Sequence, residues 1–308
     1  MNNQRNPNPL SEPTQLLNDL TQSALALQYD FIAGSSYPIG EKDNLYYLDN
    51  TSDYAQSHAK HHEDFRQFLQ EFGYYDIFIA DPNTGNIVYS VLKELDFATS
   101  ITSGPYSTTG IADAFTQAIG ATDNNQVFFS ELSSYLPSYD ALAGFLSTPI
   151  VENGETIGIL IFQIPLDRLN SLLNHQQRWS DAGFGYSGET YLVNPDSTLL
   201  TEYRFFLENQ RKYLDIIRKT MPAVAEQITM RETSIGTQPV NSLSAKSALA
   251  GQTGFKVIKD YRDVEVFSVF TPVMIGNNTY GLIAEIDTDE ALAALTTVKS
   301  NSISQTAK

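Results

Sequence analysis

The stretch "DIFIADPNTGNIVYS", residues 76 to 90, is followed along the chain by a second stretch of the same plan, "ETYLVNPDSTLLTEY", residues 189 to 203. Each begins with an apolar run typical of a strand, continues through a turn opened by Asp-Pro or Asn-Pro, and ends in another strand-like run. Asp suits the first position of a type I turn, and Pro presets φ at the second. The pattern predicts a β-hairpin at both places, and therefore a module that occurs twice.

A second pair of segments repeats in the same order. The segment "TPIVENGETIGILIFQIPLDRL" begins at Thr148, and "TPVMIGNNTYGLIAEIDTDEAL" begins at Thr271, 123 residues later, with no gap in the alignment. Asn153-Gly154 is a favoured two-residue hairpin turn, and Gly276-Asn277 fills the same place in the other copy. Matching order, turns and spacing together indicate an internal duplication.

These local hairpins favour antiparallel pairing and an α+β fold. Ile77 and Ile79 point to one face of the first strand and Phe78 and Ala80 to the other, so the sheet must be covered on both faces. Each unit is expected to contain a hairpin, a stretch with a helix, one more strand near 127–129 or 255–258, and a final hairpin. Apolar residues at helical spacing predict helices over 16–27, 54–72 and 289–298.

The composition excludes several classes of protein. The chain carries 19 basic and 36 acidic residues, a net charge of −17, so no nucleic-acid partner is expected. It has no cysteine, which excludes disulfides, thiolate catalysis and cysteine-based zinc sites. No phosphate loop or other cofactor motif is present, and no cofactor is predicted. His58 and His62 stand four residues apart, but we interpret them as part of a solvated helix face, and no metal is predicted.

Four segments together carry a family resemblance. They are "YDIFIADPNTGNIVYSVLKELDFATSITSGPY" (75–106), "SELSSYLPSYDALAGFLSTPI" (130–150), "GILIFQIPLDRL" (158–169) and "GYSGETYLVNPDSTLL" (185–200). The ordered set resembles the double Cache, or tandem PAS-like, extracytoplasmic sensor domains of bacterial chemoreceptors, sensor histidine kinases and cyclases. The resemblance implies a helical stalk at 1–70, a membrane-distal ligand-binding module at 71–167, a membrane-proximal module at 168–297, and a tail at 298–308 leading toward a membrane helix.

The resemblance also implies a function. It makes the chain the periplasmic portion of an inner-membrane receptor, tethered by flanking membrane helices, dimeric, and itself without catalytic activity. A small molecule would bind the distal module, and the proximal module would relay the change to a cytoplasmic kinase, cyclase or chemoreceptor output. Two alternatives stay open: a ligand-free spacer, and a free-standing periplasmic binding protein or hydrolase, for which the Ser90-x-x-Lys93 spacing is a weak motif.

The predicted ligand site lies in the first module. In the resemblance, the segment 135–140 and the loop around Tyr106 flank the ligand cavity, and tyrosines suit a small, partly polar ligand. Gln163 stands where amino-acid-binding relatives carry an Asp, and a neutral amide cannot neutralise an ammonium, which argues against an ordinary α-amino acid. The candidate ligand-binding residues are Tyr106, Phe129, Glu131, Tyr135, Ser138, Tyr139, Asp140, Phe145, Gln163 and Lys93.

The charge of this module narrows the class of ligand. From Glu71 to Asp167, Lys93 is the only Lys or Arg against twelve acidic residues. Buried anions require paired charge or several donors. We therefore expect a neutral or cationic ligand, or a monocarboxylate held by hydroxyls. A dicarboxylate would need Lys93, backbone N–H groups, or Lys60 and Arg66 from the preceding helix.

Overall fold

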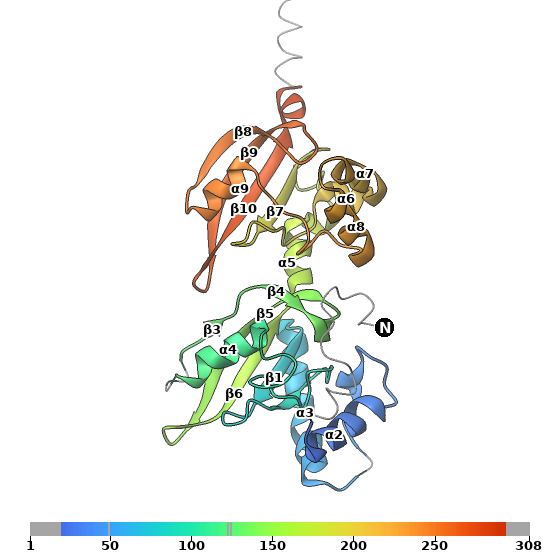
Figure 1. Cartoon of the computed structure of the whole chain (residues 1–308), viewed down its shortest axis with the longest axis vertical. Coiled ribbons are helices and arrows are strands. Elements are labelled where there is room, and N and C mark those ends of the chain that lie inside the picture. The colour runs from blue at the N-terminus through green and yellow to red at the C-terminus, as the bar shows by residue number, and fades with distance from the viewer. Residues whose placement is uncertain (1–19, 49, 122, 124, 294–308) are drawn as a thin grey trace, which may run out of the picture. The chain divides into compact units, whose positions relative to one another are not determined.

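The computed structural model describes residues 20–48, 50–121, 123 and 125–293, and it divides into two compact units between Leu166 and Asp167. We call them unit 1 and unit 2 (Figure 1). The tail predicted at 298–308 and the first part of the predicted stalk lie outside the described residues. No helix within the described ranges combines the length and apolar composition needed to cross a membrane.

Unit 1 is built on an antiparallel sheet with the strand order β2-β1-β6-β5-β3, and β4 also pairs with β5. Its strands are β1 (Asp76–Ala80), β2 (Ile87–Ser90), β3 (Phe128–Phe129), β4 (Ser133–Tyr135), β5 (Ala141–Glu152) and β6 (Glu155–Ile164). Its helices are α2 (Gln22–Gln28), the π-helix η2 (Tyr29–Ala33), η3 (Lys42–Asn44), α3 (Asp53–Phe72), α4 (Gly110–Ile119) and η4 (Leu136–Ser138).

The turn chemistry that predicted the two hairpins of unit 1 is confirmed. The Asp81 carboxylate accepts hydrogen bonds from the backbone N–H and hydroxyl of Thr84 at 2.7 Å, which closes the turn between β1 and β2. Between β5 and β6, Asn153 and Gly154 both have positive φ, +52° and +84°, as a two-residue hairpin turn requires. Local residues therefore determine both hairpins.

The sheet of unit 1 is covered on both faces, as the doubly apolar strand predicted. On one face Ile77 packs with Phe65 and Leu69 of α3. On the other, Phe78 joins the cluster that contains Ile111 and Phe115 of α4 (Figure 1). The interior of unit 1 therefore lies between this second face of the sheet, α4 and the segments around them.

The predicted helix over 54–72 is confirmed as α3, but the interpretation of its histidines is wrong. His58 and His62 are buried, not solvated. His62 lies 2.8 Å from the Tyr89 hydroxyl through Nδ1 and 2.8 Å from the Asp43 carbonyl through Nε2. The two imidazoles stack on each other, so they belong to the face of α3 that packs inward. The described residues contain no group of three His, Asp or Glu that could hold a metal ion.

Unit 2 repeats the antiparallel plan, with the strand order β7-β10-β9-β8. This corresponds to β1-β6-β5-β3 of unit 1, so the duplication predicted from the sequence is confirmed as an α+β fold of two PAS-like modules. Its strands are β7 (Glu189–Val193), β8 (Gly254–Lys259), β9 (Glu265–Ile275) and β10 (Asn278–Asp287). The helices from α5 onward are α5 (Leu166–Leu173), η5 (His175–Gln177), α6 (Arg204–Glu208), α7 (Gln210–Thr220), α8 (Pro222–Arg231) and α9 (Leu243–Leu249), and residues 288–293 are also helical.

The hairpin predicted over 189–203 forms only in part. After β7 the chain makes two isolated bridges, Val193 to Leu199 and Thr198 to Pro239, and no second strand. The backbone N–H of Leu192 donates to the Thr201 hydroxyl at 3.1 Å instead of to a carbonyl. Because this side chain takes the place of a strand partner, the chain can leave the sheet and begin α6 at Arg204.

Candidate functional site

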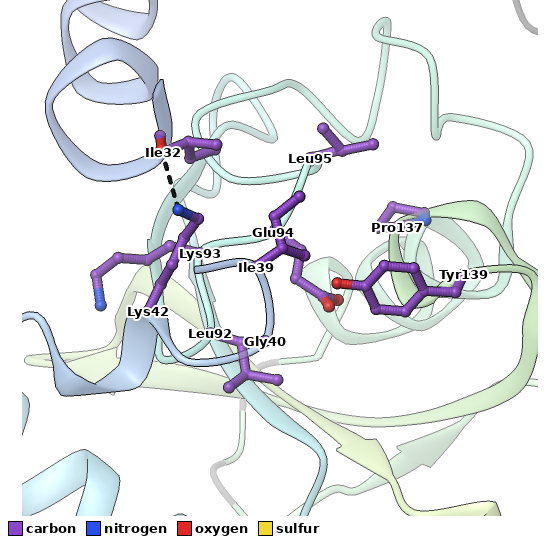
Figure 2. A pocket seen from close by; sticks show the side chains of 10 residues that line it. All are labelled: Ile32, Ile39, Gly40, Lys42, Leu92, Lys93, Glu94, Leu95, Pro137 and Tyr139. Atoms are coloured by element: carbon purple, nitrogen blue, oxygen red, sulfur yellow. Dashed lines mark hydrogen bonds between the residues drawn. The ribbon is translucent and has the colours of Figure 1, made fainter. Parts of the chain in front are cut away.

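A cavity of about 350 Å³ lies in unit 1 between three segments that are distant in sequence. The N-terminal part contributes Ile32, Ile39, Gly40 and Lys42, the loop after β2 contributes Leu92 to Leu95, and the η4 region contributes Pro137 and Tyr139. Figure 2 shows the Glu94 carboxylate pointing toward the Tyr139 hydroxyl across this space. The lining is mostly apolar, so Glu94 is the main polar feature that a bound molecule would meet.

A chain of hydrogen bonds holds Glu94 in place. The Tyr75 hydroxyl donates to its Oε1 at 3.0 Å, and the Ser138 hydroxyl donates to its Oε2 at 3.3 Å. Behind Ser138, the Gln163 amide donates to the Ser138 hydroxyl at 2.8 Å, while the buried Oε1 of Gln163 has no hydrogen-bond partner. Burial, together with two neighbouring acids, raises the pKa of Glu94 to about 9. In the absence of a cation, the Glu94 carboxyl therefore favours its protonated, uncharged form.

Asp96 is the second buried acid of the site. Its Oδ2 accepts a hydrogen bond from the Tyr135 hydroxyl at 2.6 Å, and its Oδ1 is buried without a partner. Tyr135 in turn packs edge-on against Tyr106 and Phe145, with ring centroids 5.9 and 5.0 Å away. Burial raises the pKa of Asp96 to about 7. The structure thus brings three of the predicted aromatic residues around one carboxyl.

Asp76 is the third buried acid, and its hydrogen bonds explain the Ser-x-x-Lys spacing. It accepts from the Ser90 hydroxyl at 2.7 Å and from the backbone N–H groups of Ile77 and Val91 at 2.7 and 2.9 Å. The Ser90 hydroxyl also accepts from the Lys93 backbone N–H at 2.8 Å. Because Ser90 is fully buried, its hydroxyl closes the turn after β2 and is not presented as a nucleophile.

Lys93 turns its charge away from the cavity, as Figure 2 shows. Its Nζ is buried, donates to the Val91 carbonyl at 3.0 Å, and lies 5.6 and 5.8 Å from the ring centres of Phe31 and Tyr89. Burial lowers the pKa of Lys93 to about 7. Among the ion pairs between described residues, none includes Asp76, Glu94 or Asp96.

Of the four remaining predicted site residues, one lines the cavity and three do not. Tyr139, with positive φ, is half exposed at the rim. Phe129 pairs with Leu146 on the sheet, Glu131 is exposed, and the Asp140 carbonyl accepts from the Ser134 hydroxyl. None of these last three lines the cavity. Of the ten predicted residues, Lys93 and Tyr139 therefore line the cavity, and Phe129, Glu131 and Asp140 do not. The other five form a connected buried group: Tyr106, Tyr135, Ser138, Phe145 and Gln163.

Sequence reasoning missed the N-terminal wall. Lys42 is buried, and its Nζ donates to the carbonyls of Ile32 and Tyr37 at 3.0 and 3.1 Å. Burial lowers the pKa of Lys42. The charge count began after this segment, so it did not include Lys42. Glu94 was counted among the acids of the module, but no pattern in the sequence separates a buried acid from an exposed one.

Comparison with known proteins identifies structures but no sequence family. No family model and no curated protein matches the chain. The structure is similar to the extracellular domain of a protein described as a histidine kinase, with 16% identity over 92% of this chain and 90% of that one and a TM-score of 0.48. It is also similar to the ligand-binding domain of the Pseudomonas aeruginosa amino-acid chemoreceptor PctB in complex with L-Gln, with 14% identity, 96% and 94% coverage and a TM-score of 0.46.

A third similar structure is the ligand-binding domain of the Pseudomonas fluorescens chemoreceptor CtaA in complex with L-serine. It is 10% identical over 90% of this chain and 88% of that one, with a TM-score of 0.43. The strand orders of the two units repeat one antiparallel plan, as the predicted tandem PAS-like modules require. At these identities, the roles of individual residues in this chain have to come from its own geometry.

Proposed function

We propose that this double Cache domain is the extracytoplasmic sensor portion of a bacterial transmembrane receptor, and that unit 1 binds a small molecule carrying an amine. The receptor role is supported by the family resemblance of the sequence. The ligand class is supported chiefly by one observation: Glu94 is a buried carboxyl on the wall of a 350 Å³ cavity and has no cationic partner among the described residues.

A positively charged ligand relieves an unfavourable arrangement. Burying a carboxylate without a counter-ion is costly, and the carboxyl responds by staying protonated. An ammonium beside Glu94 favours the ionised form, so its binding energy includes a charge-assisted hydrogen bond that the empty site lacks. Outside the cavity lining, the buried Gln163 Oε1 and Asp96 Oδ1 also have no partner, so this region of unit 1 is rich in acceptors and poor in donors. The apolar side chains of Ile39, Leu92 and Leu95 suit the hydrocarbon part of such a ligand.

A carboxylate ligand fits the same cavity less well. The two lysines of the lining, Lys42 and Lys93, donate their ammonium protons to backbone carbonyls. An incoming carboxylate would meet Glu94 without a free cation to balance it. The preference is therefore for an amine over a neutral molecule, and for a neutral molecule over a carboxylate.

Signalling in this proposal depends on closure around the ligand. The η4 region and Tyr139 form one wall of the cavity, and the N-terminal segment forms another. A ligand that contacts both walls binds a closed arrangement more tightly than an open one, and this difference in affinity is the energy that drives the change. Unit 2 then carries the change toward the output domain, in a receptor that acts as a dimer.

Methyl NMR of the purified chain tests the ligand class. Primary amines of two to six carbons are compared with alcohols and carboxylates of the same length at neutral pH. We expect the amines to shift the methyl signals of Ile39, Leu92 and Leu95, and Glu94→Gln to weaken this binding about tenfold or more. Glu155→Gln, at the exposed β5–β6 turn, is the matched control. Preferential binding of carboxylates, no response to any amine, or unchanged amine binding by Glu94→Gln would contradict the proposal.

A further inference from the structure

Unit 2 contains a cavity of its own, of about 250 Å³. Three tyrosines, Tyr191, Tyr203 and Tyr261, line it together with Glu285, and Met221 and Val240 are among the residues of its wall. The tyrosine rings form a continuous group, since Tyr203 lies 4.8 Å from Tyr191 and 4.1 Å from Tyr261 between ring centroids. The cavity is therefore aromatic on one side and acidic at Glu285.

Glu285 has a second buried acid directly opposite it. In the antiparallel register Glu285 of β10 faces Glu189 of β7, and the two residues are 4% and 1% exposed. Like charges placed opposite each other on neighbouring strands are destabilising. Burial, reinforced by the neighbouring carboxyl, raises the pKa of Glu189 well above its usual range, and burial raises the pKa of Glu285 to about 7.

Each of these carboxyls has one oxygen in use and one without a partner. Glu285 Oε1 accepts from the Ser268 hydroxyl at 2.8 Å, and Glu189 Oε2 accepts from the Arg204 backbone N–H at 3.1 Å and from the Tyr261 hydroxyl at 3.4 Å. Glu285 Oε2 and Glu189 Oε1 are buried, with no hydrogen-bond partner in the part of the chain that the structure describes. The Tyr191 hydroxyl also interacts with the Glu285 carboxyl, but it carries no positive charge. The pair therefore still lacks a cationic donor.

The nearby cations are already engaged elsewhere. Arg262 pairs with Asp260 and Asp287, both at 2.5 Å. The Arg204 side chain pairs with Glu208 at 2.7 Å and donates to the carbonyls of Gly185 and Gly188. Lys259, on the rim, pairs with Asp263 at 2.8 Å in an exposed position. None of the ion pairs between described residues neutralises Glu189 or Glu285.

The acid pair occupies the same place in its sheet as the candidate ligand residues of unit 1. In unit 1, Gln163 lies between Asp76 and Phe145 across three strands. In unit 2, Glu285 lies between Glu189 and Ser268. A gap-free alignment would instead match Gln163 with Ile286. The irregularity between Ile150 and Val151 gives β6 one extra residue that β10 lacks, so the strand pairing matches Gln163 with Glu285.

We propose that unit 2 holds a second binding site, for a small organic cation whose ammonium lies against Glu285, with Glu189 behind it on the neighbouring strand, and whose hydrocarbon part packs on Tyr191, Tyr203 and Tyr261. Carboxylates supply the counter-charge, and tyrosine rings attract cations through their faces. The site does not depend on the function proposed for unit 1, because all of its residues belong to unit 2.

Methyl NMR with n-butylammonium and tetramethylammonium tests this site in the Glu94→Gln background, which weakens binding in unit 1. We expect both cations to shift the Met221 and Val240 methyl signals, and n-butanol to leave them unchanged. Adding Glu285→Gln reduces the affinity about tenfold or more. Adding Glu226→Gln instead, an exposed change on α8, leaves the affinity unchanged. Glu285→Gln is also expected to raise the melting temperature without ligand, because it removes a buried repulsion.

Several outcomes would overturn the second site. They are binding unaffected by Glu285→Gln, equal shifts from n-butanol, or cation-dependent shifts confined to Ile39, Leu92 and Leu95 of unit 1. In the wild-type chain the same titration separates the two proposals. Shifts confined to Ile39, Leu92 and Leu95 leave the proposed function intact, whereas shifts confined to Met221 and Val240 overturn that function and support the second site. If Glu285→Gln lowers the melting temperature, Glu189→Gln provides the same comparison from the opposite strand.

Discussion

Side-chain hydroxyl groups help to hold each of the three buried acids of unit 1. Asp96 has no exposed surface, and the Tyr135 hydroxyl is its side-chain partner at 2.6 Å. An unsatisfied buried polar group loses its hydration without compensation, and the loss is larger for a group that can carry charge. The Tyr135–Asp96 contact is therefore worth more than an exposed hydrogen bond of the same length, and it fixes the aromatic group behind the cavity.

Tyr135→Phe is expected to lower the free energy of unfolding by about 1–3 kcal/mol, because it leaves both oxygens of Asp96 without a side-chain donor. Tyr139→Phe removes the same hydroxyl from a half-exposed ring on the neighbouring segment and should change stability by less than about 0.5 kcal/mol. Urea denaturation of the three proteins measures the difference. Equal stabilities for the two variants would show that the Asp96 contact contributes nothing.

At the scale of elements, turns and helix ends could be predicted from the sequence, whereas contacts between residues distant in sequence could not. The turn at Asp81 and the cap at Gly73, whose φ is +70°, are set by residues within a few positions, so β1–β2 and the end of α3 could be predicted. His58 and His62 could not be placed from an apolar pattern, since histidine suits both a wet and a buried helix face. The N-terminal wall of the cavity, including Lys42, meets Glu94 only through the tertiary fold.

The contacts by which His62 packs α3 against the rest of unit 1 provide a test at the scale of elements. His62→Leu removes the contacts at 2.8 Å with the Tyr89 hydroxyl and the Asp43 carbonyl, and leaves two buried polar groups without their partner. We expect the free energy of unfolding to fall by about 2–4 kcal/mol. His61→Leu makes the same change on the exposed face of the same helix and should be close to neutral. Circular dichroism during thermal unfolding compares the two, and similar melting temperatures would refute the buried role of His62.

Over the whole molecule, both units bury acids in their interiors, on a chain whose net charge is already −17. Asp76, Glu94 and Asp96 lie in unit 1, and Glu189 and Glu285 lie in unit 2. Burying unpaired carboxyls makes a fold less stable than an apolar interior would, so their retention in both copies is more consistent with binding than with packing. At matching positions of the two sheets, Asp76 and Gln163 of unit 1 correspond to Glu189 and Glu285 of unit 2, and each unit has a cavity of its own.

The same acids predict how stability depends on pH. Burial raises the folded-state pKa of Asp76 to about 6, of Asp96 and Glu285 to about 7, and of Glu94 to about 9. An acid whose pKa is raised by folding stabilises the protein fully below its unfolded pKa and loses that contribution as pH rises through the folded value. As pH rises from about 5 to 7, the ionisation of these acids therefore lowers the free energy of unfolding of the ligand-free chain.

Bases with lowered pKa values oppose this trend in two windows. Burial lowers the pKa of His58 to about 3 and of His62 to about 4, so these two groups add stability as pH rises toward 6.5. Burial also lowers the pKa of Lys93 to about 7, so Lys93 adds stability as pH rises above 7. The buried acids outnumber the histidines, so the net change from about pH 5 to 7 is a loss on the order of 3 kcal/mol. Above pH 7, Lys93 opposes the further loss from Glu94 and Glu189.

Chemical denaturation at pH 5, 6, 7 and 8 measures this dependence. Repulsion between surface acids has the same sign, but about 0.5 M salt screens it, whereas the buried groups are screened much less. We therefore expect the loss to persist in salt and to become smaller in the Glu94→Gln, Glu285→Gln double variant. Because an ammonium favours the ionised carboxyls, amine affinity should rise over the same pH interval. Stability that increases from pH 5 to 7 in high salt would mean that these acids have partners in solution, and would remove the electrostatic basis of both proposed sites.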